Sequence, residues 1–423
     1  MIRKYLVPVF LLFACIGFAQ QGTSSPYSFY GIGDIRFKGT AENRAMGGVS
    51  VFTDSIHINL QNPASYSNLK LTTFTIGGSF NSSKYTTRDA NEKAQRSTLD
   101  YIAVGIPMGK FGAAFGLIPY SSVGYRIRSS GQEFIGNNPD PQNVNRNYTG
   151  DGGLNKAFLG LAYQILPNLS IGADINYNFG KVETTNIKNF SAYQYGTEEF
   201  DNSELAGFNV NLGAMYQRKL TNKLDLYTSL AYTPESKIRL DNVRTLSLIQ
   251  YTDAVTPPVV TSLDPVGSKS TIVMPSRFTV GAGIGQKRKW LAGAEVTLIQ
   301  SSNMGNRFSD ISTARYENAV RYNFGGYYIP NYNSFSSYLS KVVYRAGVRY
   351  ENTGLIVSNE SIKDYAFTAG LGLPLGGTFS NLNVGVELGR RGTAKALLVE
   401  ENYANVILSL SLNDKWFIKR RYD

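Results

Sequence analysis

Apolar and polar side chains alternate along most of the chain beyond residue 70. The alternation is clearest over residues 169–179, 381–391 and 403–413. In the last of these, Val406 and Leu408 share one face, and Ser409 lies on the other. A period of two residues places successive side chains on opposite faces of a β-strand. The pattern therefore predicts many strands, each with one apolar and one polar face.

The alternating segments are about ten residues long or longer, which is the length of a tilted transmembrane strand. Strands in soluble proteins are usually about five or six residues long. A sheet in lipid must close on itself, because every backbone N–H and C=O group there needs a partner. The pattern therefore favours an all-β fold, a transmembrane antiparallel β-barrel over residues 70–413. A two-domain soluble β-protein is the alternative.

Short and long connections alternate between the predicted strands. The short ones are residues 108–110, 166–168, 221–223, 287–289 and 376–377, and the long polar ones are residues 129–153, 188–203, 236–268, 302–315 and 392–402. Short turns of outer-membrane barrels face the periplasm and long loops face outside. Keeping this order requires a strand over residues 315–330 and a periplasmic turn through residues 332–340. The count is then about fourteen strands, an even number as in other single-chain barrels.

The first 19 residues have the order of a secretory signal peptide. Arg3 and Lys4 precede an apolar stretch over residues 6–18, and a small-x-small cleavage site ends at Ala19. We expect the only cysteine, Cys15, to leave with this peptide, so that the mature chain forms no disulfide. A lipoprotein box over residues 12–15 is the less favoured alternative. A secreted barrel is expected to be a multi-pass protein of the outer membrane of a Gram-negative bacterium.

The composition agrees with a β-rich membrane protein. The chain has 423 residues with 28 Tyr, 23 Phe and 42 Gly, and only 17% of its residues are charged. Beyond the signal peptide there is no run of about 18 apolar residues, so a polytopic helical membrane protein is excluded. The net charge is +11, but the cations are scattered except near the C-terminus. Nucleic-acid binding is therefore not expected, because it needs a clustered basic face.

Residues 20–69 do not alternate. One or two helical turns are predicted over residues 40–45, Gly47 and Gly48 end them, and Asn62-Pro63 predicts a turn. A barrel of this size has a lumen wide enough to leak unless it is filled. We therefore predict that residues 20–69 are a hatch that plugs the barrel. A periplasmic tail is the alternative.

The hatch segment also carries a resemblance to a known family. The residues that carry it are Arg44, Gly47, Gly48, Asp54, Asn62, Pro63 and Ala64. They resemble the hatch of the FadL/TodX-type outer-membrane transporters, and residues 274–281 and 344–350 resemble later strands of those proteins. The resemblance implies passive uptake of a hydrophobic small molecule, such as a long-chain fatty acid or a hydrocarbon. Outer-membrane lipids and that ligand would be its partners, and no cofactor is expected.

Other stretches are similar to a PorV-like branch of the same family. They are residues 152–155, residues 168–172 and the basic tail over residues 414–423. This likeness implies a second function, an accessory barrel in an outer-membrane protein machine such as type IX secretion or barrel assembly. The long loops or the periplasmic tail would then contact other outer-membrane or periplasmic proteins.

A transporter of this kind needs an apolar pocket and a polar site for a carboxylate head. Candidates on the lumen faces of the strands are Arg277, Glu295, Arg345, Arg349, Glu387 and Arg391. An arginine can hold a carboxylate through two parallel N–H bonds. The alternative, which we favour for any given pair, is a network of internal salt bridges, because barrel interiors are commonly polar.

Pro119 lies within the third predicted strand of the barrel. Proline removes a donor from the strand ladder and is found at edges or bulges. In the FadL-type transporters that the sequence resembles, a kinked third strand opens the wall sideways, and Pro119 falls where that kink would be. Alternatively, the strand ends at Pro119 and a loop begins.

The sequence offers little for catalysis. The only histidine, His57, lies in the hatch between Ile56 and Ile58, so a site with several histidine ligands is excluded and no metal is expected. Any Ser-His-Asp triad would have to use this residue. A buried, hydrogen-bonded histidine is the simpler interpretation, and we expect that the protein is not an enzyme.

Overall fold

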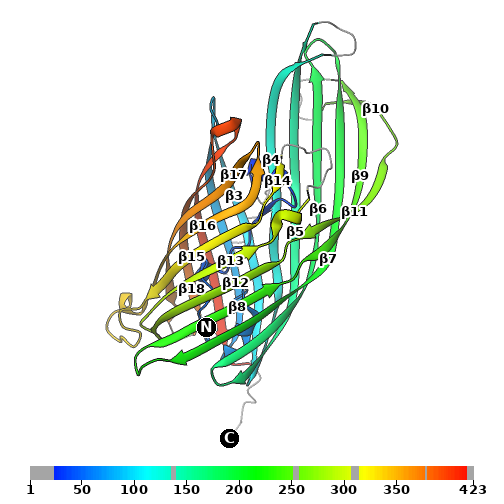
Figure 1. Cartoon of the computed structure of the whole chain (residues 1–423). Helices are drawn as coiled ribbons and strands as arrows, with labels where there is room; N and C mark the ends of the chain where they lie inside the picture. The colour runs from blue at the N-terminus through cyan, green and yellow to red at the C-terminus, as the bar shows by residue number, and fades with distance from the viewer. Residues whose placement is uncertain (1–22, 135–139, 251–256, 306–313, 377–378, 417–423) are drawn as a thin grey trace.

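The computed structural model describes residues 23–134, 140–250, 257–305, 314–376 and 379–416 (Figure 1). The predicted signal peptide and residues 417–423 of the predicted tail lie outside the described residues. No helix among the residues described is long and apolar enough to cross a membrane.

The strands form one antiparallel sheet that closes where β19 pairs with β2. The strands that build the wall are β2 (Thr72–Thr86), β3 (Asn91–Met108), β4 (Phe111–Glu133), β5 (Gln142–Leu166), β6 (Leu169–Phe190), β7 (Tyr195–Lys219), β8 (Asp225–Thr233), β9 (Ser236–Gln250), β10 (Val259–Ser262), β11 (Val266–Met274), β12 (Arg277–Gln286), β13 (Trp290–Ile299), β14 (Ala314–Tyr316), β15 (Ala319–Tyr328), β16 (Val343–Val357), β17 (Glu360–Pro374), β18 (Asn381–Gly392) and β19 (Glu400–Asp414). The segments β8–β9, β10–β12 and β14–β15 each form one wall strand, so the barrel has 14 strands. This confirms the predicted fold.

The two faces of the wall differ as the alternation predicts. On β19, Val406 and Leu408 are exposed on the outside, whereas Asn405 and Ser409 are buried inside. On β12, Phe278 and Val280 are likewise exposed. Apolar side chains that face outward suit hydrocarbon, and the inward polar side chains need partners inside the barrel.

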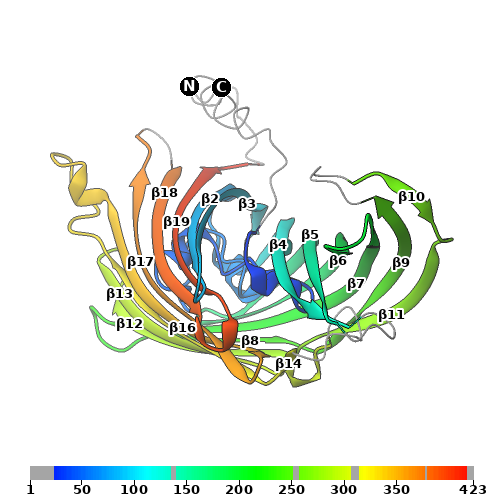
Figure 2. The same ribbon diagram turned by 90° about the horizontal axis from the view of Figure 1, so that it is seen from above.

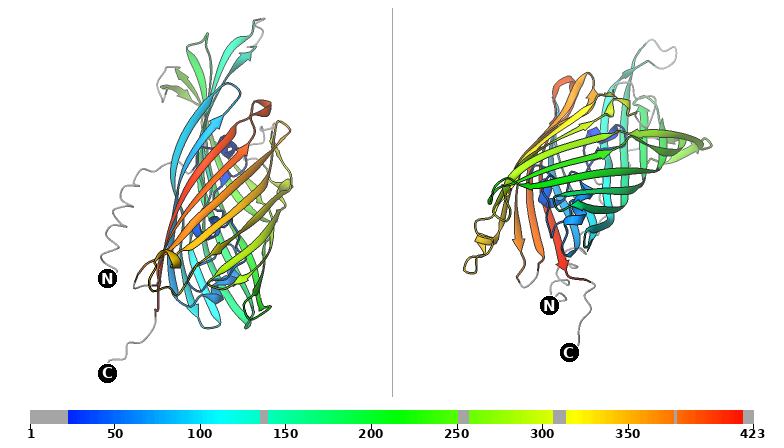
Figure 3. Two further views of the ribbon diagram at one scale, coloured as in Figure 1. Left: turned by 90° about the vertical axis from the view of Figure 1, so that its left-hand side faces the viewer. Right: turned by 60° about the horizontal axis from the view of Figure 1, so that its bottom comes forward.

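The predicted long loops are wrong in large part, because several of them are strands. β4 pairs with β5 as far as Glu133 and Gln142. β7 pairs with β9 from Tyr195 with Gln250 to Ala206 with Arg239, which takes up much of the predicted loop at 188–203 and part of that at 236–268. β7 has 25 residues and spans roughly 80 Å, although about ten residues cross a membrane. These polar hairpins keep their ladder partners beyond the membrane, so a sheet of β4–β7 and β9–β11 rises above one end of the barrel (Figures 1 and 3).

The segment before β2 runs inside the ring of strands (Figure 2). It contains η1 (Pro26–Phe29), β1 (Asp34–Ile35), α2 (Ala41–Arg44) and η2 (Pro63–Asn68). Its backbone presses against the wall at Gly47, which has a φ of +72°. A Cβ atom there would lie 2.6 Å from the carbonyl oxygen of Val348. Only glycine fits this close approach at a positive φ.

Candidate functional site

A network of buried charges joins the N-terminal segment to the wall. Arg44, the last residue of α2, donates one hydrogen bond to Asp100 of β3 at 2.9 Å and one to Glu387 of β18 at 2.8 Å. Glu387 also pairs with Arg349 of β16. All four side chains are buried. Two arginines and two carboxylates thus neutralise one another across the hatch, β3, β16 and β18.

The network continues toward the end of the barrel that carries the raised sheet. Lys38 of the hatch segment pairs with Asp364 of β17 at 2.7 Å. The hydroxyl of Tyr403 donates to the same carboxylate at 2.6 Å, and Arg349 lies 3.5 Å from it. Further along, Arg391 of β18 pairs with Asp34 at 2.6 Å. Each wall charge of this network therefore meets a partner from the N-terminal segment or from a neighbouring strand.

A second group of contacts holds the middle of the hatch. Glu295 of β13 accepts hydrogen bonds from the backbone N–H of Ser50 at 3.0 Å and from its hydroxyl at 2.6 Å. Arg345 of β16 donates to Asn383 at 3.0 Å. Asn383 in turn donates to Glu42 of α2 at 2.7 Å. The hatch is thus bonded to the wall on several sides.

The structure places the hatch-motif residues in these contacts. Gly47 donates its N–H to the Thr368 hydroxyl at 2.8 Å, and Gly48 follows it with another positive φ. The side chain of Asn62 donates to the Leu230 carbonyl at 2.9 Å and caps η2 by accepting from the N–H of Ala64. Pro63, the first residue of η2, and Ala64 are both buried. The motif residues therefore fix the hatch backbone to several strands.

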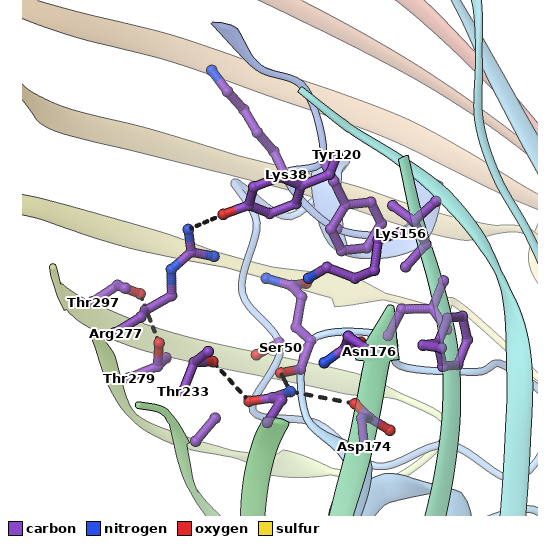
Figure 4. A pocket seen from close by; sticks show the side chains of 18 of the residues that line it. Lys38, Ser50, Tyr120, Lys156, Asp174, Asn176, Thr233, Arg277, Thr279 and Thr297 are labelled. Atoms are coloured by element: carbon purple, nitrogen blue, oxygen red, sulfur yellow. Dashed lines mark hydrogen bonds between the residues drawn. The ribbon is translucent and has the colours of Figure 1, made fainter. Parts of the chain in front are cut away.

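A small cavity remains between the hatch and strands β4–β8, β12, β13 and β15 (Figure 4). Its volume is about 80 Å³, and Lys156, Arg277, Asp174 and Glu295 are among its lining residues. Lys156 lies 4.5 Å from the centre of the Tyr120 ring, and Arg277 donates to the Tyr120 hydroxyl at 3.5 Å. Neither cation has a carboxylate within 4.0 Å in the part of the chain that the structure describes. Both therefore remain available to an anion.

The six predicted ligand residues thus fall into two groups. Arg277 and Glu295 line the cavity. The other four, Arg345, Arg349, Glu387 and Arg391, bond to the hatch or to other strands. Their surroundings match the internal network that we favoured over a ligand site. A ligand role for any of the six stays a prediction.

Pro119 lies where the wall splits. β3 pairs with β4 only from Phe111 to Leu117, and beyond Pro119 β4 continues to Glu133 with a register shift against β5. The strand therefore does not end at Pro119. Beyond Leu117, the edge of β4 that β3 no longer covers pairs with β1 instead. Asp34 and Ile35 of β1 lie opposite Ser122 and Ser121. The side wall at this point is completed by the N-terminal segment.

His57 ties together one loop of the hatch. Its Nδ1 lies 2.7 Å from Asp54, and its Nε2 lies 3.8 Å from Glu42. Burial acts to lower the pKa of His57, but the charges of Asp54 and Glu42 outweigh it, so that the pKa is raised above its ordinary value of 6.5. The imidazole thus lies between two carboxylates, whose charges favour its protonated form. No group of three or more potential metal-ligating side chains occurs in the described ranges.

The comparisons with known proteins agree with this architecture. A family model described as BamG matches residues 1–423. The chain belongs to the BamG family. No curated protein matches the sequence.

Solved structures similar to this BamG-family barrel show its fold. The toluene transporter TodX of Pseudomonas putida is 16% identical with a TM-score of 0.56, and the match covers 91% of this chain and 100% of TodX. A FadL homologue of Pseudomonas aeruginosa is 13% identical with a TM-score of 0.55, and the match covers 89% of this chain and 98% of that one. The fold is therefore that of FadL/TodX-type outer-membrane barrels. These similar structures are transporters or channels rather than enzymes.

Sequence reasoning missed several members of the site. Lys38, Asp100, Asp364 and Tyr403 were not singled out, although they complete the network. Their signal was a charged or hydroxyl-bearing residue at an inward position of a strand, or in the hatch, which is a common pattern in a barrel. Only the fold brings Arg44 to Asp100 and Glu387.

We expect that replacing Arg44 by methionine will destabilise the protein strongly. The substitution leaves Asp100 and part of Glu387 buried without a counter-charge, which costs about 3–5 kcal/mol. The midpoint of urea unfolding in detergent measures the change. The matched control is Arg390→Gln, because Arg390 pairs with Glu400 at a largely exposed position and such pairs contribute about 1 kcal/mol or less. Equal effects of the two variants would contradict the buried network.

A pH dependence follows from His57. Because folding raises its pKa, its contribution to stability is fully present below about pH 6.5 and is lost as the pH rises through the pKa of the folded state. We expect the unfolding temperature of the barrel to fall over that range, and the slope to flatten in His57→Gln. Asp54→Asn is expected to move the fall to lower pH. A slope unchanged in both variants would argue against the bridge.

Proposed function

We propose that this protein works as a closed accessory barrel in an outer-membrane protein machine of a Gram-negative bacterium. The name of its family, BamG, fits the barrel-assembly case that the sequence left open. In this role the barrel supplies surfaces to other proteins, and its lumen does not need to conduct. The fit of the hatch to the wall carries the proposal.

A hatch that must move for transport would have weak contacts with the wall. Here Arg44, Lys38 and Ser50 each reach carboxylates on the wall, and the Arg44 contacts are buried. Separating a buried pair either exposes both charges or leaves them buried without a partner, at a cost of several kcal/mol. The contacts around the hatch therefore favour a barrel that stays closed.

The cavity beside Arg277 is also unlike an apolar ligand pocket. The cavity of about 80 Å³ is smaller than the roughly 300–1,000 Å³ of small-molecule sites. Charged side chains of both signs line it, among them Lys156, Asp174 and Arg277. A hydrocarbon placed there would gain little, because these groups would lose hydration without gaining partners.

The sheet above the barrel supports the same proposal. It consists of the outer parts of β4–β7 with β9–β11, and it extends far beyond the length that a membrane requires. The edge of β4 beyond Ser122 has no strand partner on the β3 side in the described residues. Such a sheet offers a large surface to other proteins at the cell exterior.

The second candidate is a channel for hydrophobic small molecules, and two observations favour it. The fold is shared with the toluene transporter TodX. In addition, the wall splits beside Pro119, where β1 pairs with β4 in place of β3. If the hatch rearranged, Arg277 and Lys156 could receive an anionic head group while an apolar tail left sideways.

Co-purification separates the two candidates. We expect a mild-detergent extract of native membranes to yield this protein with stoichiometric partner proteins. The complex should survive in Arg277→Gln, because that side chain faces the internal cavity. A lone monomer, together with uptake of hydrophobic compounds that falls when the gene is deleted, would favour the channel instead.

A disulfide staple tests whether the hatch must move. A Cβ atom at Gly385 would lie 3.7 Å from the Cβ atom of Ala45, within the range of a disulfide. The variant Ala45→Cys/Gly385→Cys therefore links the hatch to β18 in a mature chain without other cysteines. We expect it to complement a deletion equally well when oxidised and reduced. Loss of complementation on oxidation alone, with the single-cysteine variants unaffected, would refute a closed barrel.

A further inference from the structure

Cations gather on three neighbouring turns at the end of the barrel opposite the raised sheet. The turns join β7 to β8, β12 to β13 and β15 to β16, and these strands are consecutive around the wall. Their cations are Arg218, Lys219, Lys223, Lys287, Arg288, Lys289 and Lys341, and all but the partly exposed Lys341 are exposed. The same turns contain one carboxylate, Asp225. Short turns mark this end as periplasmic.

Large apolar side chains are interleaved with these cations. In the turn between β15 and β16, Phe335 is fully exposed, Leu339 is 68% exposed and Tyr338 is half exposed. The Arg288 guanidinium lies 4.8 Å from the centre of the Tyr332 ring. Exposed apolar groups of this size mark an interaction site with a protein or a membrane.

The turn is held in shape by its own hydrogen bonds. Asn331 donates its N–H to the carbonyl of Ser340 at 2.8 Å, and the Tyr338 hydroxyl donates to the carbonyl of Pro374 at 3.1 Å. The second bond ties the turn to the end of β17. Figure 2 shows the turn at the outer edge of the ring of strands. Its apolar side chains Phe335, Tyr338 and Leu339 are exposed.

Several cations at the other end of the barrel are paired with carboxylates. There Arg146 and Lys188 pair with Glu133, and Arg244 pairs with Glu199 and Asp201. No carboxylate lies within 4.0 Å of the seven cations of the three turns, as far as the structure describes the chain. Those seven charges are therefore available to an external anion.

We propose that these three turns form a binding site for anionic phospholipids of the periplasmic leaflet. The cations would contact the phosphates, and Phe335, Tyr338 and Leu339 would enter the boundary between head groups and acyl chains. Aromatic rings prefer that boundary, and each cation near an anionic membrane surface strengthens binding by about 5-fold. Exposed cations beside exposed aromatic and aliphatic side chains, at the rim of a membrane barrel, match the phosphates and acyl chains of lipid.

Native mass spectrometry of the full mature protein tests the proposal. The protein in mild detergent is offered phosphatidylglycerol and phosphatidylcholine in equal amounts. We expect a preference for phosphatidylglycerol. If each of the three cations contributes fully, the triple variant Lys287→Gln/Arg288→Gln/Lys289→Gln should lower the affinity for phosphatidylglycerol by about 100-fold. In Phe335→Ser/Leu339→Ser, both lipids should dissociate more readily.

The matched control removes three exposed cations from the other end, Arg126→Gln/Arg128→Gln/Lys269→Gln, and should keep the preference. Heat-modified migration on a gel verifies that each variant is folded. The proposal is wrong if the wild type shows no preference, or if the triple variant at the turns binds phosphatidylglycerol as tightly as the control. It is also wrong if that variant loses a partner protein and retains its lipids. Neither result bears on the hatch, so the proposed function is tested separately.

Discussion

The structure depends on the need to satisfy polar groups inside a closed sheet. Because no backbone group in lipid can remain unpaired, the strands must form a ring, and a ring of 14 strands encloses a polar space. Its inward charges, such as Arg349, Asp364 and Glu387, cannot stay unpaired at this degree of burial. The N-terminal segment meets this need by supplying Lys38 and Arg44. The pairing of these charges therefore requires both the closed wall and the hatch inside it.

Glu387 illustrates how the network distributes charge. It accepts from Arg44 and Arg349, and it also receives the amide of Asn405 at 3.3 Å. A carboxylate with two cationic partners lets each arginine retain a second partner, Asp100 in one case and Asp364 in the other. The network stabilises the fold mainly because it leaves no buried charge without a partner. One unpaired buried charge costs more free energy than one missing hydrogen bond.

The sequence predicts the wall well and the site less well, for a physical reason. Alternation is a local property, so strands such as β19 can be recognised from a few residues. The parity of turns and loops even indicates the strand at residues 319–328. By contrast, Arg44 and Glu387 are 343 positions apart, and nothing local specifies their pairing. The boundary between loop and strand also escapes prediction, because the outer parts of β5 and β7 are polar on both faces.

The two ends of the barrel also differ in how their charges are satisfied. At the end with the raised sheet, several cations, such as Arg146 and Arg244, meet carboxylates on adjacent strands. At the end with the short turns, a strand reverses in a few residues, and in the described residues Lys287 and Lys289 form no ion pair with a carboxylate. Exposed cations without a protein partner are hydrated, and an anionic neighbour can replace that water. The free cations of the short turns therefore support the proposed lipid site at that end.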